Sequence, residues 1–409
     1  GVNAGNSIAS GGNYNVVVGD EAGTAITTGD DNTFIGYSSG DATTTAGGNT
    51  AVGSSAFSTN TTGADNVAIG EAALLRSTTA SNNTAVGNNA LRENTTGPEN
   101  VAVGSGALDS NTTGANNSAV GMAALQATTT GNNNTGLGSG ALYNNTVGFS
   151  NVAVGFNALV SDTKGNKNTA IGQSALSTQN FTSDTDSFNT AVGMSAGSLV
   201  TTGSLNTLIG AKAGDAMTTG GENVMVGYDT GTITTGDSNI VIGSQNVNSA
   251  VGVNDEIFIG RAGAGSGTRT FTIGYGDTDV QISIDGSDTS WSATSDERLK
   301  DNINSLSVGL DFIDELRPVT YEWKEKKDID PSLGRYYEEE STDPCRGDGG
   351  IHYGLIAQEV KTVIDKYSLT GKHHIWKEGV DGFQVVGIGN VMPILIKAVQ
   401  ELSAKNDAL

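Results

Sequence analysis

The residues best suited to chemistry lie in the segment TSDERLKDNI, residues 294–303. Ser295 offers a hydroxyl nucleophile, and Lys300, five positions later, offers an amine that could accept its proton. An amine acts as a general base only where burial lowers its pKa toward neutrality. Residues five apart on an α-helix lie about 140° apart around its axis, so Ser295 must stand before the first turn for Lys300 to reach it. The peptide bond Thr294–Ser295 is then the nearest target, because nucleophile and carbonyl are already in proximity.

The same segment also has a purely structural interpretation. Thr294 or Ser295 suits a helix N-cap, and Thr294 with Glu297 has the spacing of a capping box. The residues alone leave both interpretations open.

Other groups of reactive side chains are weaker candidates. His373, His374 and Cys345 lack the second spaced pair that a zinc site needs, so we expect no metal and no cofactor. Asp184 and Asp186 could suggest the paired carboxylates of glycan hydrolysis, but a solvated loop is the simpler interpretation.

Composition excludes several classes of protein. Of 409 residues, 58 are glycine and 5 are proline, without the Gly-X-Y period of collagen. Glycine at this density cannot sit in a long coiled coil. A net charge of −23 argues against nucleic acid or an anionic membrane as partner, and no apolar run is long enough to span a bilayer.

Charge divides the chain in two. Residues 1–294 hold 7 Lys/Arg and 23 Asp/Glu, whereas residues 295–409 hold 14 and 21. The first part is also rich in Gly, Asn, Thr and Ala. Composition alone therefore places a boundary near residue 290.

The first part is an internal repeat of the pentapeptide NTAVG and its variants. The spacing is 17 residues nine times running, and after one insertion of four residues the repeat resumes, with a degenerate copy at Glu256. The copies begin at Asn15, Asn32, Asn49, Asn66, Asn83, Asn100, Asn117, Asn134, Asn151, Asn168, Asn189, Asn206, Asn223 and Asn239. So strict a period predicts a solenoid in which each repeat forms one coil.

The residues of a coil predict its shape. Segments such as TAVG favour a short β-strand, and we expect the glycines that end each strand and each Thr-Thr-Gly to occupy corners with positive φ. Successive coils stack about 4.8 Å apart, so some fifteen coils form a rod of roughly 70 Å. The first Asn of each coil should form a structural ladder of amides along the rod.

The oligomeric state follows from the small core. Each coil has only about four apolar side chains, two of them usually alanine, so burial stabilises a single chain weakly. Packing around a common axis would bury the second face of each strand. We therefore expect an oligomer and favour a homotrimer.

These coils resemble the repeats of trimeric autotransporter adhesin heads, and similar repeats occur in phage tail fibres. The resemblance covers about residues 15–260 and implies a parallel β-roll or β-solenoid in a trimer. The 17-residue period is longer than the usual adhesin coil.

The last part reads as mixed α and β. The segments FTIGYG (271–276) and DVQISIDGS (279–287) alternate as strands. A helix is expected to end before Pro318 and to be followed by a strand, and GLIAQEVKTVIDKY (354–367) reads as strand into helix. Residues 328–350 form a polar, acidic loop. A terminal helix has apolar spacing that fits either a coiled-coil seam or packing on its own domain. The seam positions would be Val391, Leu395, Ala398, Leu402, Lys405 and Leu409.

Three features together resemble the endosialidase-type intramolecular chaperone: SDERLKDNI, then GLIAQEV, then the terminal helix LIKAVQEL. The resemblance implies a domain that trimerises, templates the fibre before it and cuts itself off with a Ser-Lys dyad. By it, Ser295 is the nucleophile, Lys300 the base and Thr294–Ser295 the scissile bond. The other matching positions receive supporting roles only: Asp296, Arg298, Gln358 and Glu359.

The sequence thus predicts a mainly β chain of four parts. Residues 1–14 form a lead-in, 15–262 the solenoid shaft, 263–294 a β-rich collar or tip, and 295–409 an α+β chaperone and autopeptidase. We expect a homotrimeric fibre of a phage tail or similar particle, or an extracellular adhesin, that binds a cell-surface glycan or protein. Peptide hydrolysis would be a single maturation event. The alternatives are a glycan-degrading tailspike and a structural spacer with a non-cleaving trimerisation cap.

Overall fold

The structure is a computed structural model, and it describes residues 1–276, 278–285, 292–293, 297, 300–346, 349–369, 374–378 and 382–408. The chain separates into two compact units, residues 1–294 and 295–409. Within the described residues, no helix combines the length and apolar character needed to cross a membrane.

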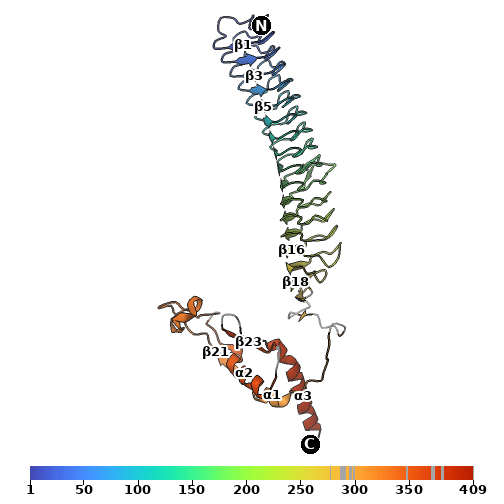
Figure 1. Cartoon of the computed structure of the whole chain (residues 1–409), viewed down its shortest axis with the longest axis vertical. Helices are drawn as coiled ribbons and strands as arrows, with labels where there is room; N and C mark the ends of the chain where they lie inside the picture. The colour runs from blue at the N-terminus through green and yellow to red at the C-terminus, as the bar shows by residue number, and fades with distance from the viewer. Residues whose placement is uncertain are drawn as a thin grey trace. The chain divides into compact units, whose positions relative to one another are not determined.

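The first unit is a parallel β-solenoid, as the repeat predicts (Figure 1). Each coil contributes one short strand, and the strands pair in parallel from the first coil to the last in the described residues. The strands of this ladder are β1 (Val16–Val18), β2 (Thr33–Ile35), β3 (Thr50–Val52), β4 (Val67–Ile69), β5 (Thr84–Val86), β6 (Val101–Val103), β7 (Ser118–Val120), β8 (Thr135–Leu137), β9 (Val152–Val154), β11 (Thr169–Ile171), β13 (Thr190–Val192), β14 (Thr207–Ile209), β15 (Val224–Val226), β16 (Ile240–Ser244), β17 (Ile257–Arg261) and β18 (Thr270–Tyr275).

Equivalent residues of neighbouring coils stand directly over one another. Val101 pairs with Ser118, and Ala102 with Ala119, one period further on. The central residue of each strand and the Ala-Leu pair of each turn, such as Ala107 and Leu108, are fully buried. The core is therefore a set of continuous columns of small and medium apolar side chains.

The predicted asparagine ladder is present. From Asn32 to Asn168, the backbone N–H and the side-chain Nδ2 of each Asn both donate to Oδ1 of the Asn one coil earlier, at 2.9–3.2 Å. Most of these amides also donate Nδ2 to a glycine or alanine carbonyl 14 residues later, as Asn100 does to Gly114 at 2.8 Å. The buried amides are thus satisfied by the repeat itself.

The glycines of the coil have two different causes. Those that end the strands do adopt positive φ, as Gly104 does at 137°. The expectation was wrong for the Thr-Thr-Gly segments, because Gly97 and Gly114 do not have positive φ. A Cβ on Gly97 would instead clash with the carbonyl oxygen of Gly114 in the next coil. Close stacking of the backbones, and not turn geometry, therefore requires this glycine.

The insertion of four residues is absorbed beside the ladder, where β10 (Gly165–Asn166) pairs in parallel with β12 (Thr185–Asp186). Asn189 still donates its backbone N–H to Asn168, at 3.1 Å, but turns its Nδ2 to Gln179. Gln179 in turn donates to the buried carboxylate of Asp162 at 2.7 Å. Burial raises the pKa of Asp162, and hydrogen bonds, first of all from Gln179, act against this rise.

At its C-terminal end the ladder runs on past residue 262, where the sequence predicted the start of a collar. β18 pairs in parallel with β17, so it forms one more rung. The following β19 (Thr278–Ser283) and β20 (Ser292–Ala293) are antiparallel. Glu256 takes the ladder position of Asn, and its carboxylate accepts hydrogen bonds from Asn248, Ser249 and Gly267.

The second unit is a small α+β domain. Its strands form two antiparallel pairs, and its helices enclose one apolar cluster that includes Phe312, Val360, Ile364 and Ile394. The elements are α1 (Leu310–Asp314), β21 (Val319–Tyr321), 3-10 turns at Lys326–Asp328 and Pro331–Tyr336, β22 (His352–Gly354), α2 (Ala357–Lys366), β23 (Trp376–Glu378), β24 (Gln384–Val386), a 3-10 turn at Ile388–Asn390 and α3 (Met392–Asp407). The helix before Pro318 and the strand-to-helix segment at 354–367 lie where the sequence predicted them.

The terminal helix α3 has two apolar faces. Ile394 and Ala398 are buried in its own unit, so Ala398 does not belong to an open seam as expected. Its exposed apolar side chains lie at a neighbouring angle around the helix. They are Met392, Leu395, Ile396, Val399 and Leu402. The last expected seam position, residue 409, lies outside the described residues.

Candidate functional site

Most of the predicted dyad segment lies outside the described residues. This applies to Thr294, Ser295, Asp296 and Arg298, so their arrangement stays a prediction. Lys300 is described: its side chain is exposed, and its backbone N–H donates to the carbonyl of Glu297 at 3.0 Å. This tight turn places Lys300 directly C-terminal to the expected N-cap.

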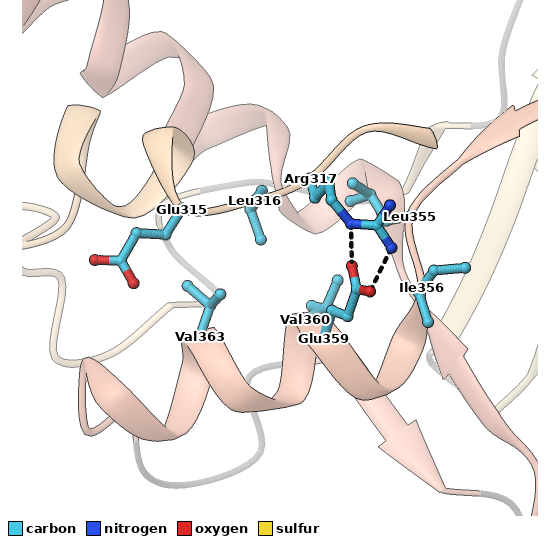
Figure 2. A pocket seen from close by; sticks show the side chains of 8 residues that line it. All are labelled: Glu315, Leu316, Arg317, Leu355, Ile356, Glu359, Val360 and Val363. Atoms are coloured by element: carbon cyan, nitrogen blue, oxygen red, sulfur yellow. Dashed lines mark hydrogen bonds and ion pairs between the residues drawn. The ribbon is translucent and has the colours of Figure 1, made fainter. Parts of the chain in front are cut away.

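Glu359, a predicted supporting residue, pairs with Arg317. Figure 2 shows the two side chains pointing toward each other, Arg317 from the segment after α1 and Glu359 from the first turn of α2. Arg317 Nε donates to Oε2 of Glu359 at 3.0 Å, and the terminal guanidinium nitrogen donates to Oε1. Such a bidentate pair fixes orientation as well as distance.

The electrostatics of this pair are those of an anchoring contact. The Arg317 guanidinium lowers the pKa of Glu359, and Glu359 raises the pKa of Arg317. Both side chains are largely exposed, at 64% and 44%, so solvent screens the attraction. Glu359 therefore holds α2 against the segment that follows α1.

The hollow beside this pair is too small to be a substrate site. It is lined by apolar side chains of α2, including Val360 and Val363, and by Leu316 and Leu355 (Figure 2). Its volume of about 10 Å³ corresponds to a single water molecule. Gln358, the neighbouring predicted residue, is exposed, and its carbonyl accepts a hydrogen bond from Thr362.

Two further contacts were not predicted from the sequence. Glu401 of α3 accepts a hydrogen bond from the backbone N–H of Leu310 at 2.8 Å, which caps the start of α1. This bond lowers the pKa of Glu401. Glu315 pairs with Lys366 and accepts a hydrogen bond from Tyr367, so α1 is also tied to α2. No short-range motif signals either contact, because the partners lie 51 to 91 residues apart.

Neither of the weaker candidates forms a reactive centre in the described residues. Asp186 pairs with Lys167, which lowers the pKa of Asp186, and Asp184 accepts a hydrogen bond from Asn166. Across the described part of the chain, no group of three or more His, Cys, Asp or Glu is placed to hold a metal ion.

Comparison with known proteins gives one match. Residues 295–369 match the family described as chaperone of endosialidase. The second unit contains an endosialidase-type chaperone domain. The match begins at the first residue of this unit and ends after α2, so α3 lies beyond it. No curated protein and no solved structure matches the chain significantly.

This chaperone domain and the solenoid of 17-residue coils together fit a phage tail fibre with an endosialidase-type chaperone. Within the domain, the described contacts tie α1 to α2 and to α3, which gives the segment around Lys300 a fixed support on its C-terminal side.

Proposed function

We propose that the chain forms a homotrimeric fibre or adhesin, carried on a phage tail or similar extracellular particle, that binds a glycan or protein on a cell surface. The observation that carries this proposal is a solenoid of near-identical coils followed directly, at residue 295, by a chaperone-of-endosialidase domain. A long repetitive shaft with an assembly domain suits an attachment fibre better than a metabolic enzyme.

The solenoid itself explains the need for a chaperone. Neighbouring coils repeat the same ladder bonds and the same strand pairing, so a trimer slipped by one coil would lose little. A compact domain at one end of the chain removes this ambiguity by bringing three ends together in register. The coils can then form one after another from that end.

The proposed cleavage is an intramolecular acyl transfer followed by hydrolysis. Lys300 Nζ accepts the hydroxyl proton of Ser295, and Oγ attacks the carbonyl carbon of Thr294. The C–N bond between the two residues breaks, and the nitrogen takes up a proton to become the α-amine of Ser295. The resulting ester on Oγ is hydrolysed by water, which leaves a carboxylate at Thr294 and restores the Ser295 hydroxyl.

The exposure of Lys300 indicates when this reaction runs. A hydrated ammonium is a poor base, and Lys300 is exposed in the single chain. Desolvation therefore has to come from assembly, when neighbouring copies cover this segment. Cleavage would then follow trimer formation and leave a shaft that is kinetically trapped in its correct register.

Expression of residues 1–294 alone beside the full chain tests the chaperone role. We expect the full chain to give a soluble trimeric shaft and the truncated chain to give aggregates or unassembled material, as judged by sedimentation. Equal yields of trimer from both would contradict the proposal. The Ser295→Ala full chain serves as control, since it retains the chaperone and removes only the nucleophile.

A further inference from the structure

One face of the solenoid lacks charge along its whole length. Each strand of the ladder has its central residue buried and its two flanking residues turned outward, as in β8, where Gly136 is buried and Leu137 is 46% exposed. The outward stripe is defined here as these flanking residues, from Val16 and Val18 in β1 to Phe271 and Ile273 in β18.

The composition of the outward stripe is uniform. The second flanking residue is Val, Ile or Leu in every strand of the ladder, and the first is Val, Ile, Thr, Ser or Phe. The stripe contains no charged side chain, although residues 1–294 carry 7 basic and 23 acidic residues. A sheet face that stays in water normally carries polar residues. The stripe therefore has the composition of a buried face.

The insertion of four residues leaves the stripe unbroken. Ile171 of β11 pairs with Val192 of β13 in the same register as the other coils. The extra residues are absorbed at β10 and β12 instead. The chain thus tolerates irregularity elsewhere in the coil but keeps the outward rows continuous.

The size of the stripe matches a stable interface. Sixteen rungs at ~4.8 Å and a width of ~10 Å give ~750 Å² per chain. Specific protein interfaces bury ~800 Å² per partner, whereas exposed apolar patches on monomers rarely exceed a few hundred Å².

We propose that the outward stripe is the face on which the solenoids of neighbouring copies pack. The rows of side chains repeat with the rise of the coils, and only a partner with the same rise can match them rung for rung. A second copy of this chain has that rise. The stripe also lets two acidic rods meet without bringing carboxylates together, since the Asp and Glu residues all lie outside it. This inference rests on the proposed fibre only for its multimeric state.

Cysteine cross-linking tests the proposal without disturbing the fold. In a full-length Cys345→Ser background, Val120→Cys places a thiol in the stripe, and Thr130→Cys places a matched thiol on an exposed position of the same coil. Treatment with a short bismaleimide should give a covalent dimer band at twice the chain mass for Val120→Cys and none for Thr130→Cys. Native mass without a Val120→Cys dimer, or a single-chain native mass, would overturn the proposal.

A lysine pair gives a second, independent reading. Val120→Lys should lower the midpoint of thermal unfolding by several degrees, because it buries a charge between copies, whereas Thr130→Lys should leave it unchanged. Equal effects of the two substitutions would mean that the stripe faces water. Both readings are separate from cleavage at residue 295, which the same gels report through the 1–294 and 295–409 fragments.

Discussion

The side-chain amide of Asn117 lies directly against that of Asn100, one coil earlier. Oδ1 of Asn100 accepts both the backbone N–H of Asn117, at 2.9 Å, and its Nδ2, at 3.2 Å, while the same Nδ2 donates to Gly131 at 2.8 Å. Each ladder residue therefore joins its coil to both neighbours. The small apolar core makes this polar column a main determinant of coil stacking.

Removal of one ladder amide should be costly. Asn117→Ala deprives the backbone and side chain of Asn134 of their acceptor and leaves the Gly131 carbonyl without its donor. Because these groups are buried, we expect a loss of about 2–4 kcal/mol in unfolding free energy. Asn144→Ala, on the exposed surface, is the control and should change it by less than about 0.5 kcal/mol. Chemical denaturation of both variants measures the difference.

Two glycines of one coil should respond oppositely to alanine. A Cβ on Gly114 would collide with the carbonyl oxygen of Gly131 and with Asn111, so Gly114→Ala should disrupt stacking and abolish cooperative unfolding of that region. Gly106 has φ of 67° but open space, with only Gln126 Nε2 at 3.6 Å. Gly106→Ala should therefore cost only about 1–2 kcal/mol of left-handed backbone strain. Hydrogen exchange of the neighbouring coils distinguishes the two, and equal effects would contradict this account of the glycines.

The chaperone domain should lose stability in acid. The Leu310 hydrogen bond lowers the pKa of Glu401, and Arg317 lowers that of Glu359. A carboxyl with a lowered folded pKa stabilises the fold above its ordinary pKa, and this stabilisation is lost as the pH falls through the folded value. Unfolding followed by the near-UV signal of Trp323 and Trp376 should therefore set in below about pH 4.5.

The matched variant for this acid transition is Glu401→Gln. Glutamine still accepts the Leu310 N–H but does not titrate, so the variant should show a shallower loss of stability between pH 5 and 3, on the order of the ordinary carboxyl range. An unchanged acid profile would show that Glu401 does not contribute.

The exposed face of α3 should serve assembly of the chaperone domain. Met392, Leu395, Val399 and Leu402 follow the spacing of a coiled-coil seam and are 41–58% exposed. Val399→Asp should therefore reduce the trimeric fraction by an order of magnitude or more and reduce cleavage with it, because cleavage requires assembly. Gln400→Asp, on another side of α3, should leave both unchanged. Sedimentation and gel analysis of the two variants decide this, and trimers of full stability in Val399→Asp would contradict it.

Regular parts of the molecule were predictable because the repeat states each interaction many times over. The strand positions, the asparagine ladder and the buried alanines follow from the 17-residue period. The reason for the Thr-Thr-Gly glycines was not predictable from local turn rules, since it depends on the distance between stacked backbones. The seam of α3 was misassigned at Ala398, because a single helix pattern cannot separate the face packed on α1 from the face left open.

The candidate site was predictable in part. Its motif residues were found in the sequence, and the comparison places them at the start of a chaperone-of-endosialidase domain. The pairing of Glu359 with Arg317 was missed, because the two segments are 42 residues apart and carry no shared period. Contacts of this kind arise only when α1 and α2 pack together.

The most direct test of the account is the intact mass of the freshly expressed full chain beside its Ser295→Ala and Lys300→Ala variants. The account predicts that the wild-type chain separates into residues 1–294 and 295–409 while both variants stay whole. A wild-type chain that stays whole while it forms trimers would contradict the catalytic assignment and make the C-terminal unit a permanent trimerisation cap.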